Sequence, residues 1–202
     1  MKLYFSPGAC SLAPHIVARE SGIEIELEKV DTKAKTTASG RDYLAINPKG
    51  YVPAVELDDG EVLTEGPAIV QFLADRKPEA ELAPPAGTMA RYRLQEMLGF
   101  INSELHKAYS PLFDPACTPE LRKNRLEHLH KRYAVLEQRL SERPHLVGDR
   151  FTVADAYLFT VTSWAAFVKL DLSPFPHVLA FQQRVAERPA VRAALAAEGL
   201  KS

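Results

Sequence analysis

A change in composition between residues 77 and 87 most constrains how this chain of 202 residues can fold. The segment is rich in proline and alanine and has no apolar periodicity; it reads Lys77-Pro78-Glu79-Ala80-Glu81-Leu82-Ala83-Pro84-Pro85-Ala86-Gly87. Before it, short strand patterns alternate with helical ones, and after it the pattern is helical throughout. The sequence therefore predicts two domains, residues 1–77 and 88–202, joined by a linker over 78–87.

The first domain is predicted to be α/β, in the order β-α-β, loop, β-β-α. Strands are expected over residues 2–5, 25–30, 54–57 and 61–63, and helices over 11–21 and from 66 onward. Asp58-Asp59-Gly60 is typical of a hairpin turn. Residues 31–50 are polar and are predicted to form a surface segment with at most a short helix near 42–46. We expect three of its lysines to be solvated unless one reaches a ligand carboxylate: Lys33, Lys35 and Lys49.

The second domain is predicted to be all-helical, with helices over residues 88–110, 119–142 and 153–170 and two shorter ones around Pro189. Thr152 and Asp155 form the capping-box pattern at the start of the third helix. Because the residues that follow are apolar nearly all round, this helix should be central and buried. Thr152 and Asp155 are therefore predicted to be structural.

Cys10 is the main candidate for reactive chemistry. It lies between the first predicted strand and the first helix, which Ser11 can cap, and a helix N-terminus favours thiolate over thiol. Position 13, where a C-x-x-C pair would have its second cysteine, holds Ala13. Chemistry at Cys10 would thus need a small-molecule thiol from outside the chain. The alternative is that Cys10 is a small buried apolar residue.

Two further features point to ligand binding. Pro67 suits the first position of a helix whose N–H groups would receive a carboxylate, while Glu65 suits an ammonium group. Glu65 could instead only complement the helix dipole. In the second domain, small and polar residues share one helical face: Gly99, Asn102, Ser103, His106 and Ser110. His106 is a candidate proton donor or thiolate stabiliser, or else a structural histidine.

Composition limits the class of protein. Hydrophobic residues make up 46% and charged residues 25% of the chain, with a net charge of −1, which does not suggest nucleic acid or an anionic membrane as partner. Two cysteines are too few for a disulfide framework, so a reducing compartment is expected. No apolar run is long enough for a membrane helix, and prolines interrupt any signal-peptide core. We expect a cytoplasmic protein without a metal.

These motifs together resemble a bacterial beta-class glutathione S-transferase. The resemblance covers essentially the whole chain and rests on five segments: Pro7-Gly8-Ala9-Cys10-Ser11, Asn47-Pro48-Lys49-Gly50 with Val52-Pro53-Ala54, Leu63-Thr64-Glu65-Gly66, Glu104-Leu105-His106-Lys107, and 151–159. It implies a thioredoxin-like glutathione-binding domain followed by an all-helical domain. It also implies a cytoplasmic detoxification enzyme that assembles as a homodimer and uses glutathione as cosubstrate.

The resemblance implies roles for individual residues. Cys10 would face the glutathione sulfur and form a mixed disulfide with it, and His106 would lie close to that sulfur. Residues implied to bind the rest of glutathione are Lys35, Val52 before a cis Pro53, Glu65, Gly66 and Lys107. Some relatives have an Asn where this chain has Gly99, and Asn102 or Ser103 could substitute for it. Apolar residues implied to line the electrophile site are Phe5, Tyr109, Phe113, Trp164 and Phe167.

The sequence leaves three functions to weigh. The leading one is conjugation of glutathione to electrophiles, together with thiol–disulfide exchange at Cys10. The second is a non-catalytic glutathione-transferase-like binding or regulatory protein, against which the retained Cys10, Glu65 and His106 argue. The third is a Cys10–His106 hydrolase, which lacks an evident residue to orient the histidine and an oxyanion-hole motif.

Overall fold

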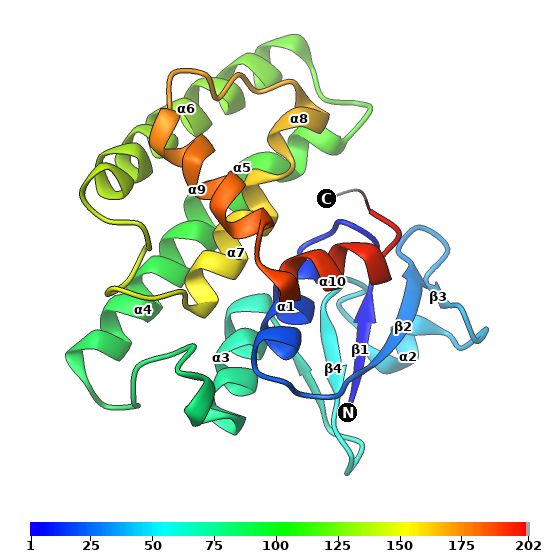
Figure 1. Cartoon of the computed structure of the whole chain (residues 1–202). Helices are drawn as coiled ribbons and strands as arrows, with labels where there is room; N and C mark the ends of the chain where they lie inside the picture. Colours follow the sequence, from blue (N-terminus) through cyan, green and yellow to red (C-terminus); the bar gives the residue numbers. More distant parts are fainter. Residues whose placement is uncertain (201–202) are drawn as a thin grey trace. The chain divides into compact units, whose positions relative to one another are not determined.

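The computed structural model describes residues 1–200 and divides into two compact units, each of which is described by itself (Figure 1). The first unit contains Met1–Ala83 together with the described residues from Ala186 onward, and the second contains Pro84–Val185. The linker lies at the first boundary between them. Part of it is ordered into a short 3-10 helix, η1 (Pro78–Ala80), and Leu82 is buried.

The first unit is built on a five-stranded mixed sheet in the order β3-β2-β1-β4-β5. The strands are β1 (Lys2–Phe5), β2 (Glu26–Asp31), β3 (Thr36–Thr37), β4 (Ala54–Glu56) and β5 (Val62–Thr64). β1 is parallel to β2, connected through α1 (Leu12–Glu20), and every other pair is antiparallel. This is the thioredoxin-like arrangement expected for the first domain.

The segment 31–50 has more structure than its polarity predicts. β3 pairs with β2, and the short helix α2 (Tyr43–Ile46) begins after Asp42, whose carboxylate accepts from Leu44 N. Tyr43 is fully buried, with its ring centroid 5.6 Å from that of Tyr4. The buried Tyr43 ring thus helps to attach a polar segment to the sheet, because it contributes a large apolar area.

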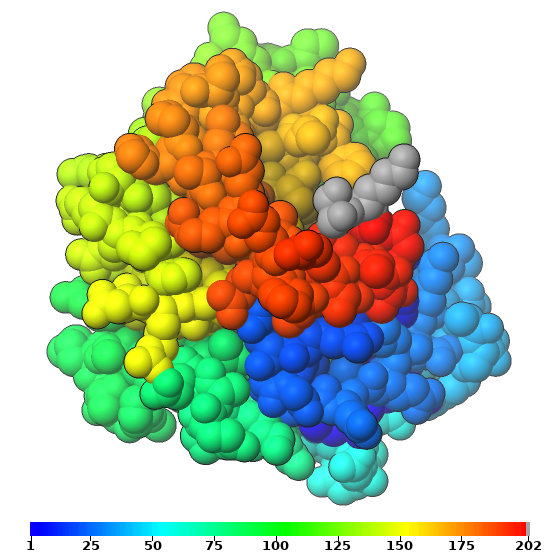
Figure 2. All heavy atoms as spheres, viewed as in Figure 1, coloured from blue at the N-terminus to red at the C-terminus, as the bar shows by residue number. Residues whose placement is uncertain are grey.

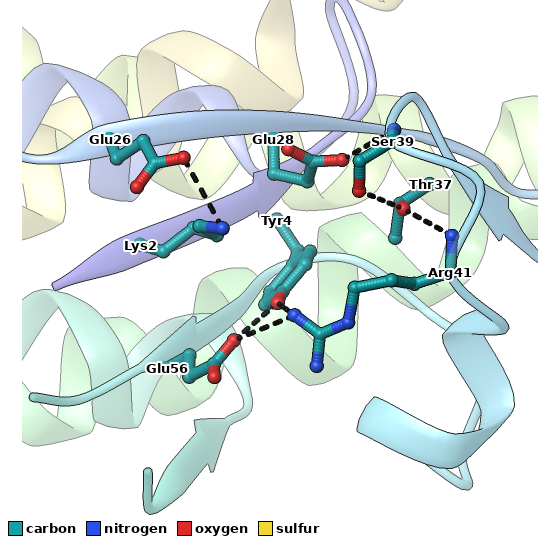
Figure 3. A network of polar contacts seen from close by, with 8 residues as sticks. All are labelled: Lys2, Tyr4, Glu26, Glu28, Thr37, Ser39, Arg41 and Glu56. Carbon is teal, nitrogen blue, oxygen red and sulfur yellow. Dashed lines mark hydrogen bonds and ion pairs between the residues drawn. The ribbon is translucent and has the colours of Figure 1, made fainter. Parts of the chain in front are cut away.

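Polar contacts hold this segment over the sheet (Figure 3). The Tyr4 hydroxyl donates to the Glu56 carboxylate, and Arg41 Nη1 donates to the Tyr4 hydroxyl over 2.9 Å. Glu28 accepts from Ser39 N at 2.9 Å. Burial, and next the hydrogen bond to Glu56, raise the pKa of Tyr4 to about 12. The bond from Tyr4, aided by Arg41, lowers the pKa of Glu56.

The helices of the first unit include a segment from the chain's end. α1 packs against α3 (Gly66–Arg76) and against α10 (Pro189–Ala197), and Figure 2 shows the red atoms of α10 against the blue atoms of α1. This differs from the predicted domain boundaries, which assigned all of 88–202 to the second domain. The physical reason is the apolar face of α10, which buries Val191, Ala194 and Leu195. Arg188 also forms a two-pronged ion pair with Glu20 of α1, at 2.6 and 2.8 Å.

The second unit is all-helical, as predicted. Its longer helices are α4 (Met89–Phe100), α6 (Pro119–Glu142), α7 (Val153–Thr162) and α9 (Pro176–Ala186), and its shorter segments are η2 (Ile101–His106), α5 (Lys107–Tyr109), η3 (Ser110–Phe113) and α8 (Ala165–Val168). The helix predicted over 88–110 is continuous through α4, η2 and α5, with a π-helical stretch at η2. The single helix predicted over 153–170 was wrong, because it breaks after Thr162 into α7 and α8.

α7 is the core helix of the second unit. All ten of its residues are buried, and the predicted capping box at Thr152 and Asp155 is present. The fully buried Asp155 carboxylate accepts from Thr152 N at 2.8 Å, from the Thr152 hydroxyl at 2.9 Å and from Leu146 N at 2.9 Å. The structural role predicted for this pair is therefore supported by three hydrogen bonds in a dry environment.

Candidate active site

Cys10 lies at the end of a tight loop between β1 and α1. Ala9 N donates to Ser6 O and Leu12 N to Ala9 O, both over 3.0 Å. The expectation that Ser11 caps α1 with its side chain was wrong. Ser11 occupies the N-cap position, but its hydroxyl lies 3.2 Å from both the N and the O of Ser6. Its side chain closes the loop instead and makes no capping hydrogen bond to the first N–H groups of α1.

A buried carboxylate from the end of the chain fixes the same loop. Glu198 Oε2 accepts from Gly8 N over 2.9 Å, and Glu198 Oε1 lies 2.9 Å from His15 Nδ1 in α1. Both side chains are completely buried. The sequence did not predict a site role for either residue, since a histidine and a glutamate 183 positions apart carry no local pattern.

The thiol of Cys10 contacts a turn that is far away in sequence. Cys10 Sγ donates to the carbonyl oxygen of Val52 over 3.1 Å, and the Val52–Pro53 peptide bond is cis, as the resemblance implies. The turn is held by the Tyr51 carbonyl, which accepts from the Tyr43 hydroxyl at 2.8 Å and from Asn47 Nδ2 at 2.7 Å. Cys10 and the Val52 backbone therefore lie side by side.

The start of α3 adjoins this turn. A Cβ added at Gly66 would lie 4.0 Å from Pro53 Cγ, in ordinary van der Waals contact. The preceding Glu65 has φ +71° and ψ 113°, a conformation that side-chain-bearing residues rarely adopt and that is enriched at functional sites. Cys10 therefore contacts Val52, and Gly66, which follows Glu65, lies next to Pro53.

The lysines of the segment 31–50 make specific contacts. Lys49 Nζ lies 2.8 Å from Glu65 Oε1, and both side chains are more than half exposed. Lys35 Nζ donates to Gly50 O over 2.8 Å and lies 5.5 Å from the centroid of the exposed Tyr51 ring. Lys35 and Lys49 therefore make contacts within the chain and place positive charge beside Tyr51 and Glu65.

In the second unit, His106 is the last residue of η2. Lys107 N donates to Asn102 O, which is the five-residue spacing of a π-helix. His106 Nδ1 lies 2.6 Å from the Tyr157 hydroxyl, which in turn donates to Asn102 Oδ1 over 3.0 Å. Two residues of the predicted polar face, Asn102 and His106, are thus joined through a tyrosine of α7 that sequence reasoning missed.

The predicted apolar residues differ in exposure. Trp164 stacks edge-on with His106, Tyr109 and Phe113, with ring centroids 5.0, 5.7 and 5.8 Å away. Phe113 and Phe167 are 50% and 76% exposed, whereas Phe5 and Tyr109 belong to the cores of their units. The Tyr109 hydroxyl lies 2.8 Å from that of Tyr133, and burial raises the pKa of Tyr109. Phe113 and Phe167 are therefore the members of the set that can meet a ligand from solvent.

Neither a metal cluster nor a membrane span is found within residues 1–200. In that range, no group of three or more histidine, cysteine, aspartate or glutamate side chains is placed to hold a metal ion. None of the helices there is both long and apolar enough to cross a membrane.

Comparison with known proteins identifies the family. Residues 8–76 match the family description "Glutathione S-transferase, N-terminal domain" and residues 100–189 match "Glutathione S-transferase, C-terminal domain". The chain is 50% identical over 201 residues to glutathione S-transferase GstA of Escherichia coli O157:H7, covering 100% of both chains.

Solved structures agree with this result. A sphingomonad glutathione S-transferase in complex with glutathione has a TM-score of 0.96 at 48% identity, with 100% of both chains covered. A bacterial beta-class glutathione S-transferase from Sphingomonas chungbukensis has a TM-score of 0.97 at 47% identity, again over 100% of both chains. The thioredoxin-like unit and the helical unit are those of a glutathione transferase. The chain belongs to the glutathione S-transferase family, and within it to the bacterial beta class.

Proposed function

We propose that this enzyme conjugates reduced glutathione to electrophilic small molecules and also exchanges thiols and disulfides through a mixed disulfide at Cys10. The observation that carries the proposal is the position of Cys10 Sγ, 3.1 Å from the Val52 carbonyl beside Pro53 and Gly66. A backbone turn next to a cysteine thiol offers hydrogen bonds to a peptide and a sulfur for its thiol. The sphingomonad relative, which was solved with glutathione bound, supports glutathione as that peptide.

Glutathione binding uses the backbone of Val52 for the cysteinyl part of the tripeptide. The Glu65 carboxylate receives the γ-glutamyl ammonium group, and the N–H of Gly66 at the start of α3 receives the γ-glutamyl carboxylate. Lys35 and Lys107 supply positive charge for the remaining carboxylate of glutathione. Asn102 and Ser103 complete the set of proposed glutathione-binding residues.

Conjugation needs glutathione as a thiolate, which attacks an electrophilic carbon and displaces a leaving group such as halide. We assign His106 to the thiol proton and Phe5, Tyr109, Phe113, Trp164 and Phe167 to an apolar electrophile site. The exposure of Phe113 and Phe167 favours these two as first contacts for an apolar molecule.

Exchange uses Cys10 itself. The Cys10 thiolate attacks the glutathione sulfur of a disulfide between glutathione and a second thiol, forming Cys10–S–S–glutathione and releasing that thiol as thiolate. A second glutathione thiolate then attacks the glutathione sulfur of the mixed disulfide, releasing oxidised glutathione and restoring the Cys10 thiolate. No outside oxidant is needed, because each disulfide bond formed replaces one that is broken.

The deciding experiment treats the protein with oxidised glutathione and measures its intact mass. The wild type should gain one glutathione that a reductant removes. Cys10→Ala should lack this adduct, and Cys117→Ala should behave like the wild type. Cys117 is a matched control because it is the chain's other cysteine and is also partly exposed. An adduct that persists undiminished in Cys10→Ala, or is missing in the wild type, contradicts the exchange role.

The same variants test conjugation with an aryl halide. We expect turnover by the wild type and a loss in His106→Ala, with a smaller effect in Cys10→Ala. No turnover at any enzyme concentration would instead favour a non-catalytic binding protein, which the naming of relatives such as GstA as transferases does not favour.

Assembly and location are part of the proposal. We propose a homodimer that works in the cytoplasm in detoxification. Two cysteines are too few for a disulfide framework, which supports a reducing compartment. Light scattering of the purified protein should give about twice the monomer mass of 22.4 kDa.

A further inference from the structure

The geometry points to Tyr157 as a positioning residue that, together with Asn102, holds His106 in the tautomer with its proton on Nδ1. Its importance for catalysis rests on the proposed function, in which His106 acts on the glutathione thiol. Three contacts within the second unit carry the inference: the 2.6 Å contact between Tyr157 and His106, the 3.0 Å bond to Asn102, and the packing of Trp164.

A count of protons fixes the direction of the hydrogen bonds. A tyrosine hydroxyl has one proton, and here it donates that proton to Asn102 Oδ1, an amide oxygen that can only accept. Toward His106 Nδ1, 2.6 Å away, the hydroxyl can then offer only a lone pair. The neutral imidazole must therefore carry its proton on Nδ1 to form this bond.

The surroundings make this arrangement rigid. Tyr157 is only 1% exposed and belongs to α7, whose N-terminus the buried Thr152 and Asp155 cap. Asn102 and His106 are the second and last residues of η2, so the same π-helical segment presents both groups to one hydroxyl. The Trp164 ring meets His106 edge-on with the centroids 5.0 Å apart. Rotation of the imidazole would lose the hydroxyl contact and this packing together.

The tautomer decides what the histidine can do. With the proton on Nδ1, Nε2 presents a lone pair, so neutral His106 can accept the glutathione thiol proton and become an imidazolium. With the opposite tautomer, Nε2 would carry an N–H and could only donate to a thiolate that had already formed. Tyr157 and Asn102 thus make His106 a proton acceptor toward the thiol.

The test reads the tautomer directly by nitrogen-15 NMR of the histidine side chains, without glutathione. The His106 resonance is assigned as the one missing in His106→Ala. In the neutral wild type we expect a protonated Nδ1 and an unprotonated Nε2. Asn102→Leu leaves Tyr157 without its acceptor, so its proton should go to Nδ1 and the tautomer should reverse. Asn102→Asp retains an acceptor oxygen and should keep the wild-type tautomer.

Tyr157→Phe should also lose the Nδ1 preference, and its kcat for aryl halide conjugation should fall about fivefold to tenfold while the KM for glutathione stays constant. Tyr133→Phe is the control, because Tyr133 is another fully buried tyrosine bonded to hydroxyls of the second unit. It should destabilise the protein without changing the His106 signals. A wild-type histidine protonated on Nε2, or an Asn102→Leu histidine still protonated on Nδ1, overturns the inference.

The two hypotheses fail separately. Absence of conjugation with the expected tautomer would overturn the proposed function and leave the positioning role of Tyr157 standing. An active enzyme whose His106 has the opposite tautomer would overturn the positioning role of Tyr157 and leave the proposed function standing.

Discussion

The two halves of the chain, its two compact units, hold their candidate functional residues by different means. In the first unit the groups that would meet glutathione are mostly backbone atoms and exposed charges: the Val52 carbonyl, the start of α3, and Glu65 with its φ of +71°. In the second unit the groups are side chains joined by hydrogen bonds, in which His106 and Asn102 share the hydroxyl of the buried Tyr157.

The difference determines which substitutions should damage each half. A site made from backbone depends on local chain geometry, so a substitution that changes φ and ψ matters more than one that shortens a side chain. A site made from buried side chains depends on the helix that carries them. Here that helix is α7. Its capping box has no proposed ligand contact, but it lies at the start of the helix that carries Tyr157.

The largest effect should come from breaking the support of the second half. Asp155→Ala would leave Leu146 N, Thr152 N and the Thr152 hydroxyl without their buried acceptor. We expect a loss of about 3 kcal/mol in the free energy of unfolding, since each unsatisfied buried donor costs about 1–3 kcal/mol. Urea denaturation measures it. Thr152→Ser keeps the hydroxyl and is the control; a loss for Asp155→Ala no greater than for Thr152→Ser would contradict the prediction.

A smaller effect should appear in the first unit at alkaline pH. The pKa of Tyr4 is raised to about 12, above the ordinary value of 10.0, so the folded state holds this proton more tightly. Its contribution to stability is complete below pH 10 and is lost as the pH rises through 12. Between pH 9 and 11.5 the wild type should lose about 2 kcal/mol more than Tyr4→Phe.

Denaturation at the two pH values measures this loss. The exposed Tyr51 provides the control, because Tyr51→Phe should follow the wild type. Equal alkaline losses in wild type and Tyr4→Phe would show that burial and the hydrogen bond to Glu56 do not hold the Tyr4 proton.

The smallest effects compare one substitution in both units. Gly8 has φ +70° in the Cys10 loop, so Gly8→Ala should destabilise the protein by about 1–2 kcal/mol. Gly99 is exposed in α4, and an added Cβ would meet no atom within 4 Å, so Gly99→Ala should stabilise it by about 0.5–1 kcal/mol. Thermal denaturation gives both signs, and the same sign for both variants would remove the proposed contrast between the halves.

Much of this arrangement follows from local patterns. The Pro67 helix start, the helix over 119–142 and the Thr152–Asp155 capping box depend on neighbours in sequence, and all three are present. Predictions failed where a side chain finds a partner that the local pattern does not indicate. The Ser11 hydroxyl turns to Ser6 rather than to the helix, and Tyr43 anchors a segment whose composition is polar.

The sequence by itself determined the two kinds of domain and the candidate chemistry at Cys10, Glu65 and His106, because periodicity, turn residues and caps act over a few positions. Only the tertiary structure decided that Val52 meets Cys10, that Glu198 closes the Gly8 loop and that Tyr157 joins His106 to Asn102. These contacts span between 42 and 190 positions of the chain. Tertiary packing creates these contacts, and a local sequence pattern does not indicate which buried group will pair with which partner.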